Sequence, residues 1–268
     1  MNKTCCTPSQ HTDGILRYTL CETQTAGVNP KAEAFTTTRL IGRDPIRLCD
    51  AFGIQAVRFA RPHQVHGVVI RQIAEEFFAL PDNIRTMLLD GVDAVIYDAK
   101  NACIGISTAD CIPVVCYDTK HHCAAAIHAG WRGTAERIVI RAIEQMHTTY
   151  GTEASDLHCV IGPGISMQSF EVGDEVYDSF AEKGFPMADI AIQMPDTNSS
   201  KSDCAEGKKP LKWHINLKEC NRMLLLSLGV REENIIVSDI DTMTDLDFFS
   251  ARREGAETGR MLTGIILR

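Results

Sequence analysis

Four short apolar runs between residues 94 and 127 constrain the fold more than any other feature of the chain. The runs cover residues 94–97, 103–107, 113–117 and 123–127. They are rich in β-branched residues or alanine, and turn-forming sequences separate them. Apolar runs of this length and composition are typical of strands that are buried on both faces. The runs therefore predict a set of buried strands.

Helical patterns lie on either side of the chain's centre and do not alternate regularly with the strands. The sequence predicts one helix over residues 134–150, with Gly151 at its carboxyl end, and another over residues 216–228. Asn216 is expected to cap the second helix, with Glu219 as its capping-box partner. A polar segment at residues 195–210 predicts a mobile loop. This order favours an α+β fold with mixed sheets over a doubly wound fold.

Charge and cysteine content narrow the functional classes. The 268 residues carry a net charge of -8, which argues against nucleic-acid binding through a basic face. No apolar run approaches the roughly 20 residues that a membrane helix needs. Eleven cysteines, an odd number, occur without a visible export signal. We therefore expect a cytoplasmic protein that binds neither membranes nor nucleic acid and has few or no disulfides.

Polar side chains stand at the ends of two of the buried runs. Asp110 and Cys111 follow one run, and His128 follows another. A buried polar group costs a few kcal/mol unless it has a partner. Cys111 and His128 fit either a metal site or a nucleophile–base dyad.

A third candidate ligand, His66, lies in the polar connection at residues 61–67. Two imidazoles and one thiolate match the three protein ligands that catalytic zinc sites usually have, with a fourth position open to water. Copper competes well for the same ligands. The spacing is scattered and contains no Cys-x-x-Cys pair, so the residues alone leave both the metal site and the dyad open.

Arginines beside apolar runs form a second group of candidates. They are Arg39, Arg132, Arg252 and Arg253. Guanidinium groups pair well with phosphate or carboxylate, so this set predicts an anion pocket. Glu171 follows a Gly-Pro-Gly turn at residues 162–164 and is a candidate acid, base or supporting residue. The turn is not a phosphate-binding P-loop, because it lacks the Gly-Lys-Ser/Thr ending.

Seven segments together give the sequence a family resemblance. They are residues 35–39 (Phe-Thr-Thr-Thr-Arg), 64–67 (Gln-Val-His-Gly), 108–113 (Thr-Ala-Asp-Cys-Ile-Pro), 128–133 (His-Ala-Gly-Trp-Arg-Gly), 161–165 (Ile-Gly-Pro-Gly-Ile), and 249–253 (Phe-Ser-Ala-Arg-Arg) with 258–260 (Thr-Gly-Arg). This set resembles the laccase-domain family, also called multicopper polyphenol oxidoreductases and now regarded as purine nucleoside phosphorylase/adenosine deaminase enzymes. The resemblance covers residues 34–268, after an N-terminal tail and first strand at residues 1–33.

The resemblance implies a single-domain, four-layer α/β/β/α sandwich. It implies a metal, zinc or alternatively copper, on His66, Cys111 and His128. The implied activity is phosphorolysis of adenosine, inosine and S-methyl-5'-thioadenosine, with some adenosine deamination. The implied partners are purine nucleosides and phosphate.

Roles for single residues follow as expectations. Arg39, Cys111 and His128 are the expected catalytic residues. The residues expected to contact substrate are Arg39, Trp131, Arg132, Glu171, Arg252 and Arg253.

Two departures and two other activities accompany this reading. The Gly-Gly and Ser-Leu-Asn-Leu segments that usually follow the motif arginine are replaced by Leu40-Ile-Gly-Arg-Asp-Pro45, and a late Cys-Thr pair is replaced by Asp241-Thr242. Nine histidines without a His-x-His pair disfavour a true multicopper laccase. A copper-dependent polyphenol oxidase using the single site, and a metal-free Cys-His hydrolase or peptidoglycan-precursor editing enzyme, are the alternatives.

Overall fold

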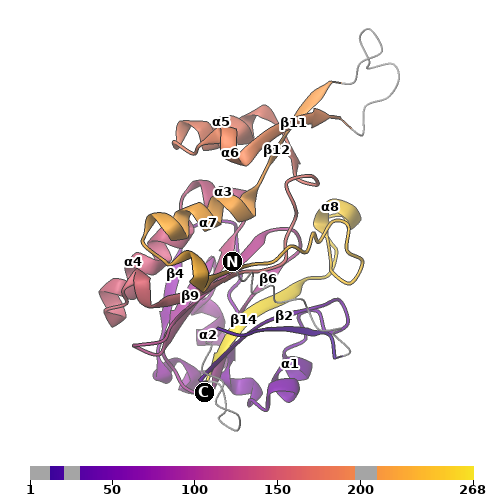
Figure 1. Ribbon diagram of the computed structural model, residues 1–268. Coiled ribbons are helices and arrows are strands. Elements are labelled where there is room, and N and C mark those ends of the chain that lie inside the picture. Colours follow the sequence, from indigo (N-terminus) through magenta and orange to yellow (C-terminus); the bar gives the residue numbers. More distant parts are fainter. Residues whose placement is uncertain (1–12, 21–30, 197–209) are drawn as a thin grey trace.

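Two mixed β-sheets, packed face to face, form the centre of the molecule (Figure 1). The computed structural model describes residues 13–20, 31–196 and 210–268. The larger sheet has six strands in the order β13-β9-β7-β8-β5-β4. Their bounds are Ile235–Val237, Leu157–Ile161, Ile112–Asp118, Cys123–Ala129, Ala94–Tyr97 and Ile70–Ile73. The β13/β9 and β4/β5 pairs are parallel and the other pairs are antiparallel.

The second sheet has five strands in the order β1-β2-β14-β6-β3. Their bounds are Ile15–Tyr18, Ala32–Thr37, Met261–Leu267, Ala102–Thr108 and Phe59–Ala60. The short β3 pairs in parallel with β6, whereas the other neighbours are antiparallel. The last strand of the chain therefore lies in the middle of this sheet.

Alternating side chains of each strand enter different layers of the core. In β5, Val95 and Tyr97 pack between the two sheets, whereas Ala94 and Ile96 face the helices outside. Strand side chains alternate between faces with a period of two, so a strand covered on both sides must be apolar at every position. The continuous apolar runs of the sequence have this explanation.

Helices cover the outer face of each sheet. Helices α4 (Ile138–Tyr150) and α7 (Leu217–Ser227) pack their apolar faces on the six-stranded sheet. Helix α1 (Pro45–Phe52) packs Leu48 and Phe52 on the five-stranded sheet. The resulting order of layers is α/β/β/α, which confirms the predicted α+β sandwich.

The remaining helical segments lie around these layers. They are η1 (Ala56–Arg58), η2 (Glu75–Ala79), α2 (Asp82–Leu88), α3 (Trp131–Ala135), η3 (Ala154–Asp156), η6 (Glu232–Asn234) and α8 (Ala251–Glu254).

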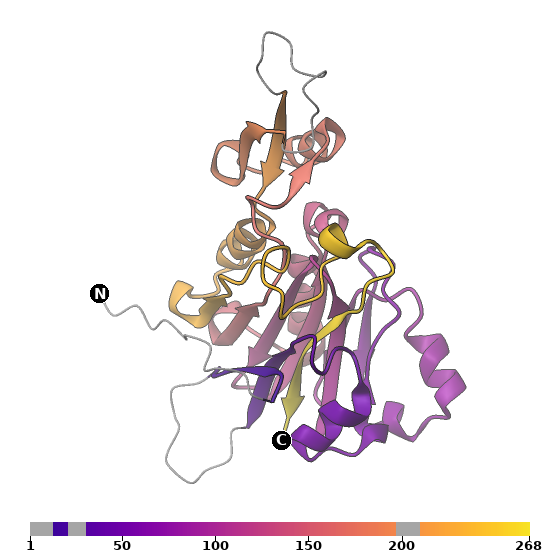
Figure 2. The ribbon, with the colours of Figure 1, turned by 90° about the vertical axis from the view of Figure 1, so that its right-hand side faces the viewer.

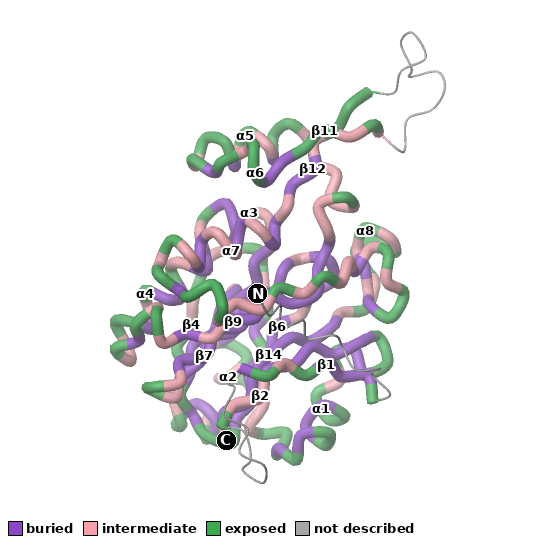
Figure 3. Tube along the Cα trace, in the orientation of Figure 1, coloured by how far each residue is buried: buried purple, intermediate pink, exposed green. Residues whose placement is uncertain are grey.

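A smaller unit projects from the sandwich (Figures 1 and 2). It combines a three-stranded antiparallel sheet with two helices. Its elements are β10 (Glu171–Val172), α5 (Asp174–Glu182), α6 (Met187–Ile190), β11 (Ala191–Pro195) and β12 (Leu211–Ile215). Figure 3 shows buried residues concentrated in the sandwich and many exposed ones in this projection. The predicted loop at residues 195–210 falls here, and residues 197–209 of it lie outside the described residues.

One predicted helix is wrong as a single element. Residues 134–150 are divided between α3 and α4, because Arg137 adopts a left-handed conformation with φ 60°. The Arg137 guanidinium donates to the Lys183 carbonyl at 2.9 Å and lies over the Phe185 ring. Tertiary contacts thus hold a break that the helical periodicity conceals.

The predicted cap of α7 is confirmed, but its capping box is not. The Asn216 side chain accepts a hydrogen bond from the Glu219 N–H at 3.1 Å. The Glu219 carboxylate pairs with Arg222 instead of returning to the cap. Within the described ranges, no helix has the length and apolarity needed to cross a membrane. The cysteines that the structure describes are free thiols.

Candidate metal centre

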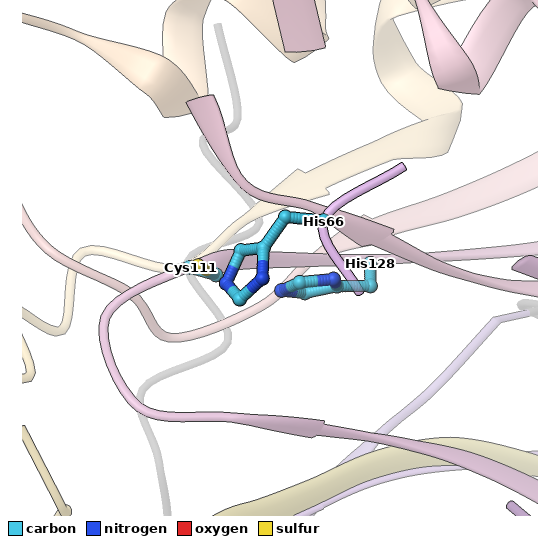
Figure 4. Close-up of side chains that lie close together, drawn as sticks. All are labelled: His66, Cys111 and His128. Carbon is cyan, nitrogen blue, oxygen red and sulfur yellow. The ribbon is translucent and has the colours of Figure 1, made fainter. Parts of the chain in front are cut away.

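Three segments that are distant in the sequence bring His66, Cys111 and His128 together (Figure 4). His66 lies in the connection between β3 and β4, Cys111 lies in the turn between β6 and β7, and His128 lies in β8. One nitrogen or sulfur atom from each residue lies within 4.8 Å of the others. His128 is buried, Cys111 is half-buried and His66 is exposed. The cluster is therefore anchored in the core and open on one side.

The register of the larger sheet places two of these side chains. Strands β7 and β8 pair Ile112 with Ala129 and Pro113 with His128, which brings Cys111 beside the end of β8. Gly130 follows directly, and a Cβ atom there would lie 3.1 Å from the Cys111 Sγ and 3.3 Å from the His66 ring. The missing side chain leaves room for the three donors to approach one another.

Asp93 supports two of the three candidate ligands from beneath. Its carboxylate is fully buried and lies 2.8 Å from the His128 Nδ1. It also accepts hydrogen bonds from the backbone N–H groups of Val65, His66 and Gly67 at 3.3, 2.9 and 2.7 Å. Burial alone would raise the pKa of Asp93, but these hydrogen bonds hold it below its ordinary value. An ionised Asp93 fixes the Nδ1 proton of His128, so the Nε2 atom faces Cys111 and His66.

The Cys111 thiol and the buried His128 imidazole each shift the pKa of the other. Burial alone would raise the pKa of Cys111, but the charge of His128 and hydrogen bonds from both histidines lower it to about 6. Burial alone would lower the pKa of His128, but the charge of Cys111 and the bond to Asp93 raise it to about 9. Near neutral pH the pair is therefore a thiolate beside an imidazolium.

The donor set fits a metal ion of borderline softness. Thiolate sulfur and imidazole nitrogen are the ligands that zinc and copper prefer. The carboxylate behind His128 provides the outer hydrogen bond that metal-binding histidines usually have. The His66-Cys111-His128 group could thus bind a metal.

The cluster lies in the wall of a large pocket. This cavity has a volume of about 1290 Å³, and His66, Cys111 and His128 all line it. Among the described residues predicted to contact substrate, Arg252 also lines it, and its guanidinium lies over the Phe170 ring at 5.6 Å. The structure therefore joins the metal cluster and one predicted arginine in a single cavity.

Two other predicted arginines converge on Glu254 outside the pocket lining. Arg39 forms an ion pair with Glu254 and donates to the Phe248 carbonyl at 3.0 Å. Arg253 donates to Glu254 at 2.7 Å and to the Thr242 carbonyl at 2.8 Å. These bonds lower the pKa of Glu254 to about 2. Roles of Arg39 and Arg253 in substrate binding stay predictions.

The remaining predicted contacts are also outside the pocket lining. Trp131 begins α3 and packs against the helical side of the core, with the Arg132 guanidinium 4.3 Å from its ring. Glu171 begins β10, and its carbonyl accepts a hydrogen bond from Arg252 at 3.0 Å. Glu171 thus contacts the pocket arginine through its backbone.

Comparison with known proteins identifies the family. The family model described as multi-copper polyphenol oxidoreductase laccase matches residues 25–268, which is most of the chain. The chain belongs to this family. A solved member of similar fold, YlmD from Geobacillus stearothermophilus, has a TM-score of 0.75 and 27% identity over 97% of this chain and 98% of that one.

Two relatives in the family carry names that state an activity. A purine nucleoside phosphorylase from Bacteroides thetaiotaomicron is 42% identical over 207 residues, covering 77% of this chain and 72% of that protein. The adenosine deaminase RL5, from an unknown prokaryotic organism, is 34% identical over 257 residues, covering 87% and 93%. The similarity supports an enzyme that acts on purine nucleosides.

Asp110 is a supporting residue whose role the sequence did not reveal. It adopts φ 85° and is buried. Its carboxylate accepts hydrogen bonds from the hydroxyls of Thr242 and Ser250 at 2.7 and 3.0 Å, and from the Arg252 N–H at 2.6 Å. A polar residue at the end of a buried run was the signal for Asp110, but its partners lie more than 130 positions away. Asp110 thus connects the Cys111 turn to the segment that carries Arg252.

The altered late pair has a defined structural role in this family member. Asp241 accepts hydrogen bonds from the Ser166 N–H and hydroxyl at 3.1 and 2.8 Å, and from the Ser169 hydroxyl at 2.6 Å. Its neighbour Thr242 binds Asp110. The pair therefore fastens the segment after the Gly-Pro-Gly turn to the Cys111 turn.

Proposed function

We propose that this chain is a zinc-dependent purine nucleoside phosphorylase that acts on adenosine, inosine and S-methyl-5'-thioadenosine and also deaminates adenosine. The observation that carries the proposal is the His66-Cys111-His128 cluster, which lines a cavity of about 1290 Å³. The relatives named purine nucleoside phosphorylase and adenosine deaminase support the choice of substrate. Zinc is proposed over copper because two imidazoles and one thiolate match a three-ligand catalytic zinc site.

The chain's own residues would prepare the pocket for these reactions. Bound zinc would supply a Lewis acid and a water molecule acidified to a pKa of about 7. His66, Cys111 and His128 would hold it, with Asp93 keeping the His128 proton on Nδ1. Arg252 would pair with an anionic group of a substrate. Arg39 and Arg253 would hold the Arg252 segment through Glu254.

The atoms of phosphorolysis balance with nucleoside and phosphate as the only reactants. A phosphate oxygen forms a bond to the ribose C1′ as the bond from C1′ to the purine nitrogen breaks. The purine keeps that electron pair and takes up the proton that the phosphate loses, and the other product is ribose 1-phosphate. The pocket contributes by holding phosphate and nucleoside together and by stabilising charge. Deamination instead adds water at the purine C6 and releases ammonia.

Product and metal analysis together test the proposal. Purified protein should contain close to one equivalent of zinc, and adenosine with phosphate should yield adenine and ribose 1-phosphate, with inosine from deamination. The variant His128→Ala should lose metal and at least a hundredfold of the phosphorolysis rate while remaining folded. Full phosphorolysis by His128→Ala would refute the site.

Two alternatives are each favoured by one observation. The family description favours copper-dependent polyphenol oxidation at the single site, and this predicts oxidation of a phenol by the copper-loaded protein. The thiolate–imidazolium pair of Cys111 and His128 favours a metal-free hydrolase, as in peptidoglycan-precursor editing. That reading predicts full activity after a chelator has removed all metal.

A further inference from the structure

The pocket beside the metal cluster has more cationic than anionic side chains. Its charged lining, apart from histidines, consists of Arg43, Arg61, Arg85, Arg252, Arg260, Asp82 and Asp110. Both carboxylates already have partners. Asp82 lies 3.5 Å from Arg85, and Asp110 accepts three hydrogen bonds from a distant segment of the chain. The lining therefore holds positive charge that its own carboxylates do not balance.

Three of these arginines are held by backbone carbonyl groups. Arg85 donates to the Phe59 carbonyl at 2.7 Å, and Arg252 donates to the Glu171 carbonyl at 3.0 Å. Arg260 donates to carbonyls of its own loop. Their guanidinium groups have fixed structural partners, which accounts for their positions in the wall.

Arg43 and Arg61 have no such carbonyl partners among the described residues. Throughout the described ranges, neither forms an ion pair, and Arg43 forms no hydrogen bond through its side chain. Arg61 makes one side-chain bond, from Nη1 to the Ser107 hydroxyl oxygen at 3.2 Å. Both arginines are exposed residues in the lining of the same pocket. Surrounding protein lowers the pKa of Arg61, and the charge of Arg43 lowers it further, in agreement with this shared location. Two like charges without a counterion create a local positive potential.

Ser107 completes this part of the wall with a donor. Its oxygen accepts from Arg61, so its own proton is available to another acceptor. Gln64 fixes the backbone of Ser107 with two hydrogen bonds, at 2.7 and 2.9 Å. Arg61 is five residues before His66 and Ser107 is four residues before Cys111, so the same two connections carry this group and two candidate ligands.

We infer that Arg43, Arg61 and Ser107 form an oxyanion subsite of the pocket that binds a phosphate group. Guanidinium groups match phosphate oxygens in shape and charge, and a dianion between two arginines removes their repulsion. The inference rests on the proposed function for the nucleoside that would share the cavity. The phosphate group belongs either to inorganic phosphate, as the second substrate, or to a nucleoside 5′-monophosphate.

Calorimetric titration of the full-length protein with inorganic phosphate tests the subsite. The variants are Arg43→Gln and Arg61→Gln, and Arg231→Gln is the matched control because Arg231 is exposed and outside the pocket lining. Each pocket variant should weaken phosphate binding about tenfold or more, the effect of losing one charged hydrogen bond. The control should stay within twofold of the wild type, and unfolding temperatures should match. Arg61→Lys keeps the positive charge but loses the planar guanidinium group, so its phosphate affinity should lie between those of the wild type and Arg61→Gln.

A second titration distinguishes the two phosphate sources. If AMP binds at least tenfold more tightly than adenosine, and Arg61→Gln removes that preference, the subsite holds a phosphate ester. If the free phosphate affinity alone depends on Arg43 and Arg61, it holds the second substrate. If no phosphate ligand binds in a manner that depends on either arginine, the inference is wrong.

Turnover measurements separate this inference from the proposed function. Arginine-dependent phosphate binding without any phosphorolysis would refute the proposed function and leave the subsite standing. Phosphorolysis in which both variants keep the KM for phosphate, together with an AMP affinity that neither variant changes, would refute the subsite and leave the function standing.

Discussion

Asp93 shows how one buried carboxylate determines the chemistry of its neighbours. It holds His128 by a side-chain contact of 2.8 Å and holds the His66 segment by three backbone N–H groups. A buried carboxylate with several hydrogen bonds stays ionised and fixes the tautomer of the histidine it binds. Asp93 is therefore a positioning residue for two of the three proposed ligands.

Replacing this carboxylate should weaken metal binding. The amide of Asp93→Asn is uncharged and has one acceptor oxygen, so it cannot accept all the hydrogen bonds that the carboxylate accepts. Zinc affinity should therefore fall about 10- to 100-fold. Competition with a fluorescent chelator measures the affinity. The matched control is Asp90→Asn, because Asp90 pairs with His63 at the surface, where both side chains are about 70% exposed or more. Equal affinities in the two variants would contradict the role of Asp93.

Metal affinity should also depend on pH in a defined direction. Between pH 7 and 9 Cys111 is already a thiolate, with a pKa of about 6, whereas His128 keeps its proton up to about 9. The metal must displace that one proton, so affinity should rise about tenfold per pH unit up to pH 9 and then level off. Chelator competition at several pH values, corrected for protonation of the chelator, gives the slope. A zinc affinity that does not change from pH 7 to 9 would show that metal binding displaces no proton from His128.

The residue types of the site were more predictable than its supports. His66, Cys111 and His128 could be proposed because few side chains bind zinc, and the resemblance selected them among the histidines and cysteines. Asp93 gave no signal, since an aspartate before a buried strand usually lies in a turn. Arg43 and Arg61 also escaped notice, because an unbalanced charge is recognised only when the partners of every neighbour are known.

At the scale of elements, the turn from β6 to β7 carries the most concentrated set of constraints. Asp110 occupies its left-handed position, and Cys111 follows. The Asp110 carboxylate holds Thr242, Ser250 and the first turn of α8. Because aspartate tolerates positive φ better than most residues, one side chain serves both the turn and the distant segment.

Truncating this side chain should destabilise the turn and the segment it binds. Asp110→Ala loses three buried hydrogen bonds, so the free energy of unfolding should fall by about 2–4 kcal/mol. Urea unfolding measures the change, and Asp247→Ala is the control because Asp247 is exposed in the segment near Ser250. The control should change by less than about 0.5 kcal/mol. A similar small change in Asp110→Ala would show that water replaces these bonds.

Local patterns predicted some elements well and failed where distant contacts decide. Helix α4 ends at Gly151, which has positive φ, as the glycine signal predicted. The buried strands β5 to β8 also lie where the apolar runs placed them. The break at Arg137 was missed because its partners, Lys183 and Phe185, belong to another part of the chain.

At the scale of the whole molecule, the metal cluster lies where the chain crosses between the two sheets. The connection that carries His66 leads from β3 in the smaller sheet to β4 in the larger one. The turn that carries Cys111 leads from β6 to β7, so it also crosses from the smaller sheet to the larger one. His128 belongs to the larger sheet alone. A metal on these three residues would therefore fasten two crossings to one strand.

Metal removal should accordingly lower the stability of the whole sandwich without unfolding it. The two sheets keep their own apolar core, so the metal-free protein should stay folded. A ligand present at 100 times its Kd adds about 2.7 kcal/mol, which for a chain of this size corresponds to about 5–10 °C in Tm. Circular dichroism on chelated and zinc-reloaded protein measures the shift. His66→Ala, which removes the most exposed ligand, should have a Tm that does not respond to zinc. A wild-type Tm that is equally unresponsive would mean that the three side chains hold no metal in the folded protein.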